Sequence, residues 1–264
     1  SIQDIISQNS DDLKVKPVSE LKQVMPESNI YNAYYSYDIK PDFTIFDRIL
    51  YTRVEDTNIE GLDLIETVMN TTHEYTHYRQ TKKEADLLND LSNENYNQAK
   101  LISYIGQSMF LSIFDSEMQK EVLLPSLKKS NVIQKFMMPK SNENSNFVIV
   151  PKEQKVTPQT VLKAAGFKNV NEFRKYVNSN FNKGYNVIAK YFAENHPLAD
   201  DFPDKNNPRS LYKQVKKLCA YKAASEKEAY LTESILAKKF LNTENTLNID
   251  VFPIYYEMIE QALS

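Results

Sequence analysis

The stretch NTTHEYTHYRQ, residues 70–80, contains two of the three histidines in this 264-residue chain. His73 and His77 are four residues apart, and Glu74 directly follows the first of them. Ahead of this stretch and within it, a set of residues recurs at the spacing of one helix face: Ile65, Val68, Met69, Thr72 and Thr76. This spacing predicts a helix that begins near Leu62. Residues four apart on a helix point the same way, so both imidazoles are expected on one face, one turn apart.

The sequence before this helix predicts two strands. NIYNAYYSYDI (29–39) is rich in tyrosine, and FTIFDRILYTRV (43–54) is rich in β-branched and aromatic residues, both of which favour strands. The sequence after the helix is mainly helical, with one further short strand at 146–151. Further helices are predicted within 84–138, as a pair within 158–194, from about residue 210 onward, and over YYEMIEQAL (255–263). We therefore expect an α+β fold, mostly helical, with a small sheet packed on the helix that carries the histidines.

The predicted domain organisation is one large domain with a lead-in segment. Residues 1–29 are polar and are interrupted by Pro17 and Pro26, which predicts an N-terminal arm with a short helix over SELKQV (19–24). Residues 30–264 are long enough to bury a substantial single core.

Composition argues against several classes of function. The 32 basic and 35 acidic residues give a net charge of −3, so neither nucleic acid nor an anionic membrane is an expected partner. No apolar run approaches the roughly 18 residues that a membrane span needs. The single cysteine, Cys219, excludes an internal disulfide and a cysteine-based zinc site. With four glycines and no GxxxxGK or GxGxxG pattern, nucleotide binding is disfavoured.

The spacing of His73 and His77 predicts a shared metal ion. Two imidazoles one turn apart can each place a ring nitrogen about 2 Å from the same ion. Glu74 lies about 100° around the helix, on the rim of such a site, where it can act as a general base on a zinc-activated water and pass the proton to a leaving amine. The alternative is that the histidines only pack or cap the helix, but a chance HExxH match in a chain so poor in histidine is rare.

HEYTH, after a strand pair and on a helix, resembles the active-site helix of the zincin metallopeptidases. The resemblance implies a Zn²⁺ cofactor held by His73 and His77, Glu74 as the base, and a protein or peptide substrate. In the metzincin branch a glycine would stand at Gln80 and a third histidine at Lys83, so that branch is excluded.

The gluzincin branch takes its third ligand, a glutamate, from a later helix. ASEKEAYLTES (224–234) supplies an ExxA pattern with Glu226 as ligand and the small Ala229 allowing two helices to approach. Ser225 and Tyr230 depart from the Asn and Asp of thermolysin-like enzymes, so the pattern is closer to the looser ExxA form, as in the catalytic domain of anthrax lethal factor.

The alternatives to Glu226 as ligand are Glu228, His196 and other acidic residues of the chain. With Glu226 as ligand, residues from about 101 to 209 would be a helical insertion that forms part of a substrate groove.

Further roles are predicted for a few residues near these motifs. His196 or the hydroxyl of Tyr230 could stabilise an oxyanion in catalysis. Glu233 or Glu66 could orient a ligand histidine. The strand 43–54 could bind a substrate backbone as an added strand.

The expected function is that of a zinc-dependent endopeptidase. A non-catalytic interaction or structural protein on a zincin scaffold is the alternative, and a closed site with four protein ligands would indicate it. The Ser start, the lack of a secretory signal and the single cysteine fit a cytoplasmic chain or one delivered into a host cell. A selective bacterial toxin or effector protease fits these features, and so does a phage-encoded or housekeeping peptidase.

Overall fold

The computed structural model has an α+β fold that is mostly helical and carries a small mixed sheet, which confirms the predicted fold class. No helix in the described part of the chain has the length and apolar character needed to span a bilayer. The described residues are 12–25, 32–53, 58–114, 155–198, 208–244 and 246–264. The predicted strand at 146–151, and the part of the predicted helical region from 115 to 138, lie outside these residues.

In the described residues the sheet has three strands, β1 (Lys14–Pro17), β2 (Ala33–Ile39) and β3 (Ile45–Thr52), in the order β1-β3-β2. The central strand β3 pairs in parallel with β1 and antiparallel with β2. Strands β2 and β3 confirm the two predicted strands. Over Ile49–Thr52, β3 is bonded to β1 on one side and to β2 on the other, so the prediction that the strand 43–54 could add a substrate strand is wrong for this half. On the β2 side the edge strand of the sheet is β2.

Part of the predicted N-terminal arm belongs to the sheet. Besides β1, it contains the helix α2 (Val18–Val24), which confirms the short helix expected over SELKQV. Leu13 and Val15 are two residues apart, so they face the same side of a strand, and both pack with the buried Leu50. These two apolar contacts, together with the pairing of β1 with β3, attach residues 12–24 to the sheet.

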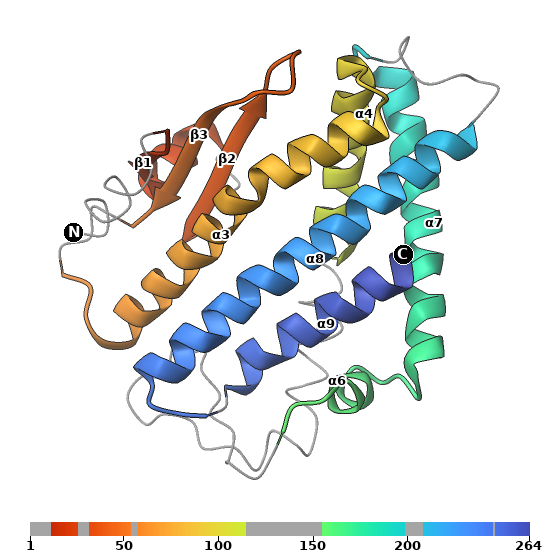
Figure 1. Ribbon diagram of the computed structural model, residues 1–264. Coiled ribbons are helices and arrows are strands. Elements are labelled where there is room, and N and C mark those ends of the chain that lie inside the picture. The colour runs from red at the N-terminus through yellow and green to blue at the C-terminus, as the bar shows by residue number, and fades with distance from the viewer. Residues whose placement is uncertain (1–11, 26–31, 54–57, 115–154, 199–207, 245) are drawn as a thin grey trace.

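Helix α3 (Gly61–Leu91) carries the histidines and lies between two layers. The sheet covers one side of it and helix α8 runs along another (Figure 1). After Gly61 the helix contains no glycine or proline, which allows its unusual length. Because two sides of α3 are covered, some of its polar side chains are buried and form hydrogen bonds inside the protein. Thr71 Oγ1 of α3, for example, is hydrogen-bonded to Thr52 Oγ1 of β3 at 2.6 Å. The position of α3 is therefore fixed from both sides.

Helix α8 (Pro208–Phe240) runs antiparallel to α3, and α9 (Leu247–Leu263) packs on α8 (Figure 1). Side-chain bonds mark the register of α3 and α8 along their length. Lys222 Nζ is 2.9 Å from Glu84 Oε1, and Gln214 Nε2 donates to the carbonyl of Leu91 at 2.7 Å. The long helical pattern predicted from about residue 210 is confirmed, and it brings the C-terminal part of the chain alongside the HEYTH turn.

The main core lies among α4 (Tyr96–Met109), α6 (Pro158–Ala164), α7 (Val170–Asn195), α8 and α9. Its most completely buried side chains include Leu101, Ile105, Phe181, Leu218 and Tyr256. The described parts of the segment predicted as an insertion, 101–209, thus supply helices to this core. They pack as an integral part of the domain because their apolar faces meet α8 and α9 directly.

Candidate metal centre

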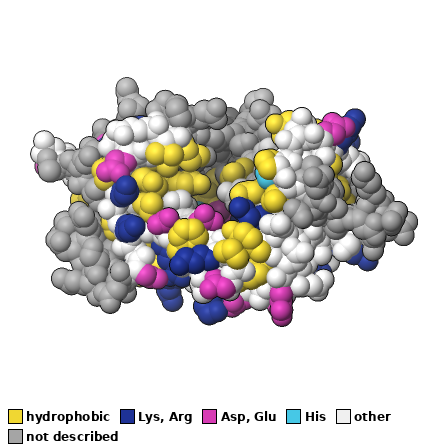
Figure 2. All heavy atoms as spheres, turned by 90° about the horizontal axis from the view of Figure 1, so that it is seen from above, with side chains coloured by type: hydrophobic (Ala, Val, Ile, Leu, Met, Phe, Trp, Pro, Cys, Tyr) yellow, Lys and Arg dark blue, Asp and Glu magenta, His cyan; other side chains and the backbone are white. Residues whose placement is uncertain are grey.

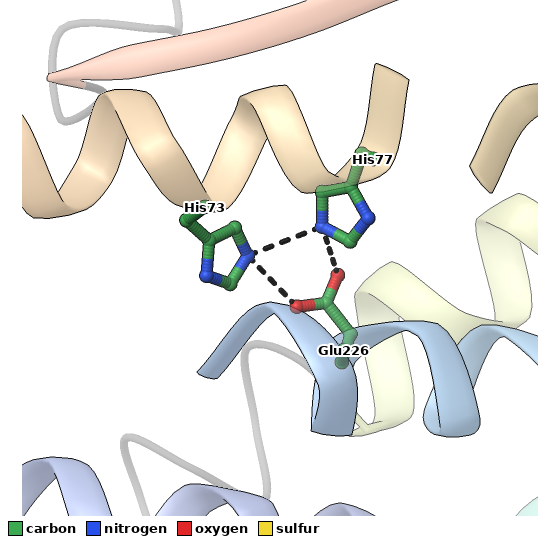
Figure 3. Close-up of side chains that lie close together, drawn as sticks. All are labelled: His73, His77 and Glu226. Carbon is green, nitrogen blue, oxygen red and sulfur yellow. Dashed lines mark hydrogen bonds and ion pairs between the residues drawn. The ribbon is translucent and has the colours of Figure 1, made fainter. Parts of the chain in front are cut away.

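The HEYTH turn directs both imidazoles from α3 toward α8 (Figure 3). His73 Nε2 and His77 Nε2 lie 3.1 Å apart, and the ring planes are inclined at 74°. His73 is buried and the side chain of His77 is 21% exposed. The spacing of one helical turn is what places the two ring nitrogens side by side.

Glu226 of α8 completes the cluster (Figure 3). Its Oε2 lies 3.1 Å from His73 Nε2 and its Oε1 3.2 Å from His77 Nε2. Ala229, one turn later, is fully buried, as expected where a small side chain lets helices approach closely. The structure thus brings together the three residues predicted as metal ligands.

The donor set fits a zinc ion. Two imidazole nitrogens and a carboxylate oxygen are ligands that zinc accepts, and donors about 2 Å from a tetrahedral ion stand about 3.3 Å from one another. The two Nε2 atoms, 3.1 Å apart, are close to that value, and each lies 3.1 or 3.2 Å from a different oxygen of the Glu226 carboxylate. Three protein donors also leave one tetrahedral position for water, the arrangement of catalytic zinc sites.

The outer nitrogen of His73 is held by Glu233. His73 Nδ1 lies 2.7 Å from Glu233 Oε1, close enough for an ion pair although the two groups are not aligned as a hydrogen bond. A carboxylate at Nδ1 favours the proton on that nitrogen and leaves the Nε2 lone pair for a metal. Of the two acids predicted to orient a histidine, the structure places Glu233 in that position.

The outer nitrogen of His77 is held through Gln80. His77 Nδ1 lies 2.9 Å from Gln80 Oε1, and Gln80 Nε2 in turn donates to Glu228 Oε2 at 2.8 Å and to the carbonyl of Ser225 at 3.1 Å. The side-chain NH₂ of Gln80 donates both of its hydrogens to residues of α8, so its oxygen, Oε1, is free to accept a hydrogen bond from His77 Nδ1. Glu228, the alternative third ligand, therefore contacts Gln80 and is not one of the clustered donors.

Sequence reasoning missed Gln80. Its only signal was its position three residues after His77 on the same helix face, which brings it near that histidine.

Glu74 lies beside the cluster and is fixed by the edge strand. Its Oε2 accepts a hydrogen bond from the backbone N–H of Tyr35 in β2 at 2.9 Å. Burial raises the pKa of the Glu74 carboxyl above its ordinary value, although the two imidazoles and the Tyr35 N–H act in the opposite direction. A carboxylate has acceptor capacity left after one such bond, so Glu74 can also hold a water. A raised pKa suits a group that takes up and returns a proton near neutral pH.

The charges of the cluster are strongly coupled. Burial would lower the pKa of His73, but Glu233 and Glu226 outweigh it and raise that pKa well above its usual value. Burial would likewise raise the pKa of Glu226, but the two imidazoles lower it. Without an ion, the site is thus stabilised by imidazole–carboxylate attraction. A divalent cation would compete with protons for the same donor atoms.

A pocket of about 170 Å³ opens beside the cluster. Glu74, His77 and Glu226 line it on one side. The other lining residues come from β2, from the next turns of α3, from the C-terminal end of α4 and its continuation, and from α8; they include Tyr34, Tyr35, Tyr37, Gln107, Phe110 and Leu111. Two of the three candidate donors, His77 and Glu226, and the candidate base Glu74 therefore face a space that a substrate can enter.

The two residues predicted to stabilise an oxyanion lie in different surroundings. The ring of Tyr230 meets the ring of His73 at a centroid distance of 4.6 Å and stacks with Phe252 at 4.7 Å. Tyr230 therefore packs against His73 and helps to hold that imidazole in place. His196 caps the C-terminal end of α7, accepts from the N–H of Leu198 and contacts Phe192. The structure does not place His196 among the lining residues of the pocket beside the cluster or among its donors.

No protein-family model, curated protein or solved structure matches this chain. The chemistry of the site has to be inferred from its own donors, partners and pocket.

Proposed function

We propose that this chain is a zinc-dependent endopeptidase of the zincin type. The observation that supports this most is the cluster of His73 Nε2, His77 Nε2 and the Glu226 carboxylate beside a pocket that His77, Glu226 and Glu74 line. Residues from two distant parts of the chain form this arrangement. A purely structural role for the histidines would need neither the open side nor the adjacent carboxylate.

His73, His77 and Glu226 would hold the ion, with Glu233 and Gln80 keeping the imidazole Nε2 atoms turned toward it. Zinc, when bound, supplies a Lewis acid that lowers the pKa of water and polarises a carbonyl oxygen. Glu74 would take a proton from the attacking water at its carboxylate and donate it to the amide nitrogen as the C–N bond breaks. Tyr35 N–H orients Glu74 for both transfers.

The edge strand β2 offers a way to bind the peptide backbone. It lies at the end of the sheet, and its residues Tyr34, Tyr35 and Tyr37 line the pocket beside the cluster. An extended peptide can hydrogen-bond to such an edge as an added strand. This placement would bring an amide bond of a protein substrate alongside Glu74, which itself is bonded to β2.

The test is hydrolysis of a peptide mixture, prepared by digesting a whole proteome, with new termini identified by mass spectrometry. The chain loaded with zinc should cleave peptides, and Glu74→Gln should lower kcat by about 10²- to 10⁴-fold, the contribution of a positioned base. Glu74→Gln should still bind one zinc, because Glu74 is not among the clustered donors.

A matched control is Asp90→Asn, an exposed acid on the same helix, which should keep full activity. If the wild-type chain binds zinc and cleaves nothing, or if Glu74→Gln is as active as the wild type, the peptidase mechanism is wrong. Zinc binding without hydrolysis would favour the alternative, an interaction protein on this scaffold.

A further inference from the structure

A second pocket adjoins the candidate metal centre along β2. Its volume is about 310 Å³, and it shares Tyr34, Tyr35, Tyr37 and Gln107 with the pocket beside the cluster. It lies between β2 and one face of α4, where lining residues recur at Tyr96, Lys100, Ser103, Tyr104 and Gln107. A peptide extended along β2 past Glu74 would carry a neighbouring side chain into this space.

The floor of this second pocket is apolar. Leu88 of α3 and Ala99 of α4 line it and are 1% and 4% exposed. The Tyr96 hydroxyl donates to the carbonyl of Ile39 at 2.8 Å, which ties the start of α4 to the end of β2. Leu88 and Ala99 are thus buried beneath the pocket, and an apolar group that contacts them would be removed from water.

Aromatic residues are prominent in its lining. Tyr34, Tyr37, Phe43, Tyr96 and Tyr104 all line it. Phe43 and Tyr96 already meet edge to face at a centroid distance of 6.4 Å, the arrangement that a further ring would extend. In the view from above, hydrophobic side chains gather around a hollow, with acidic and basic side chains beside it (Figure 2).

Lys100 is the cation among the described residues that line this pocket. Its Nζ lies 5.4 Å from the ring centroid of Tyr96 and 5.8 Å from that of Tyr104, so it already interacts with ring faces. Asp38 also lines the pocket and carries the opposite charge. An acidic substrate side chain attracted by Lys100 would be repelled by Asp38, whereas an aromatic ring would meet no charge opposition.

We propose that this pocket selects a substrate with a large aromatic side chain next to the bond that is cleaved. The inference rests on the proposed peptidase function for its consequence in catalysis. Binding of the aromatic side chain itself requires only the pocket, so it can be measured without hydrolysis.

The binding test uses Glu74→Gln loaded with zinc and fluorescein-labelled hexapeptides that differ at one position. Peptides with Phe or Tyr should bind at least about tenfold more tightly than the same peptides with Ala or Glu. In the background of this variant, Ser103→Trp should fill the pocket and reduce that preference to less than about threefold.

Two further variants make the test specific. Tyr104→Ala removes one exposed wall and should weaken the aromatic preference, while Tyr191→Ala, an exposed tyrosine on α7, should leave it unchanged. Lys100→Met should reduce the preference by about two- to fivefold, the contribution of an exposed cation–π contact. Circular dichroism and bound zinc show whether each variant is folded, and Tyr104→Ala decides the question if Ser103→Trp does not fold.

Equal binding of all peptides, or an aromatic preference that survives Ser103→Trp and Tyr104→Ala, would overturn the proposal. A preference for Glu that disappears in Lys100→Met would overturn it in favour of acidic substrates. If the wild-type chain hydrolyses no peptide while the aromatic preference in binding is found, the peptidase function fails and the pocket assignment stands.

Discussion

Replacing Glu233 by glutamine is expected to weaken zinc binding although Glu233 is not a ligand. The side chains of Glu233 and His73 are each 9% exposed, and their contact at 2.7 Å is shielded from water. Glutamine keeps the shape but loses the negative charge that favours the Nδ1 proton and strengthens Nε2 as a donor. Partners of this kind contribute about 10- to 100-fold to metal affinity.

This loss can be converted into a thermal shift. A 10- to 100-fold weaker affinity removes about 1.4 to 2.7 kcal/mol of the stabilisation by zinc at a fixed, saturating concentration. For a domain of this size, each kcal/mol corresponds to about 2 to 4 °C in Tm. The rise in Tm on adding zinc should therefore be smaller by about 3 to 11 °C in Glu233→Gln than in the wild type.

The assay combines a zinc titration against a competing chelator with thermal unfolding in zinc and in EDTA. Glu194→Gln on α7, where Glu194 makes an exposed ion pair with Lys190, is the matched control and should behave as the wild type. Unchanged zinc affinity and an unchanged Tm rise in Glu233→Gln would refute the role assigned to this contact.

Three further predictions concern the buried contacts and the metal. Lys222→Met should destabilise the chain by about 3 to 5 kcal/mol at pH 7, because it leaves the largely buried Glu84 without its cationic partner. Burial alone would raise the pKa of Glu84, but Lys222 holds it below its ordinary value. The stabilisation is therefore present above about pH 4.3 and is lost as the pH falls through the folded pKa, so urea unfolding should show a smaller effect of the mutation at pH 3.5. Thr71→Val should cost about 1 to 3 kcal/mol in the same assay by leaving Thr52 Oγ1 unpaired in the interior. Chelation by EDTA should abolish peptide hydrolysis, and added zinc should restore it; activity that persists without metal would contradict the proposal.

Features that depend on local spacing were predictable from the sequence. The four-residue interval between His73 and His77 determines that both rings share a helix face, whatever the rest of the fold does. The helices with long uninterrupted patterns, α3 and α8, could be predicted for the same reason. Glu226 was predicted through the ExxA resemblance, because no local property distinguishes it from Glu228 two residues later.

Features that depend on pairing between distant segments were not predictable. The order β1-β3-β2 makes β2 the edge strand, and nothing within residues 43–54 shows that Ile49–Thr52 of β3 is bonded on both sides. Strand β1 has four residues and ends at Pro17, so its pattern was too short to separate from an arm. The role of Gln80 follows from the register of α3 against α8, which places Ser225 and Glu228 at its amide group.

The zinc content of purified protein, measured after equilibration with zinc and removal of the excess, tests the central claim most directly. The wild type and Glu228→Gln should each retain one zinc per chain, and Glu226→Ala should lose it or bind it far more weakly. A wild-type chain that binds no zinc, or a Glu226→Ala chain that binds it as tightly as the wild type, would contradict the metal centre inferred from His73, His77 and Glu226.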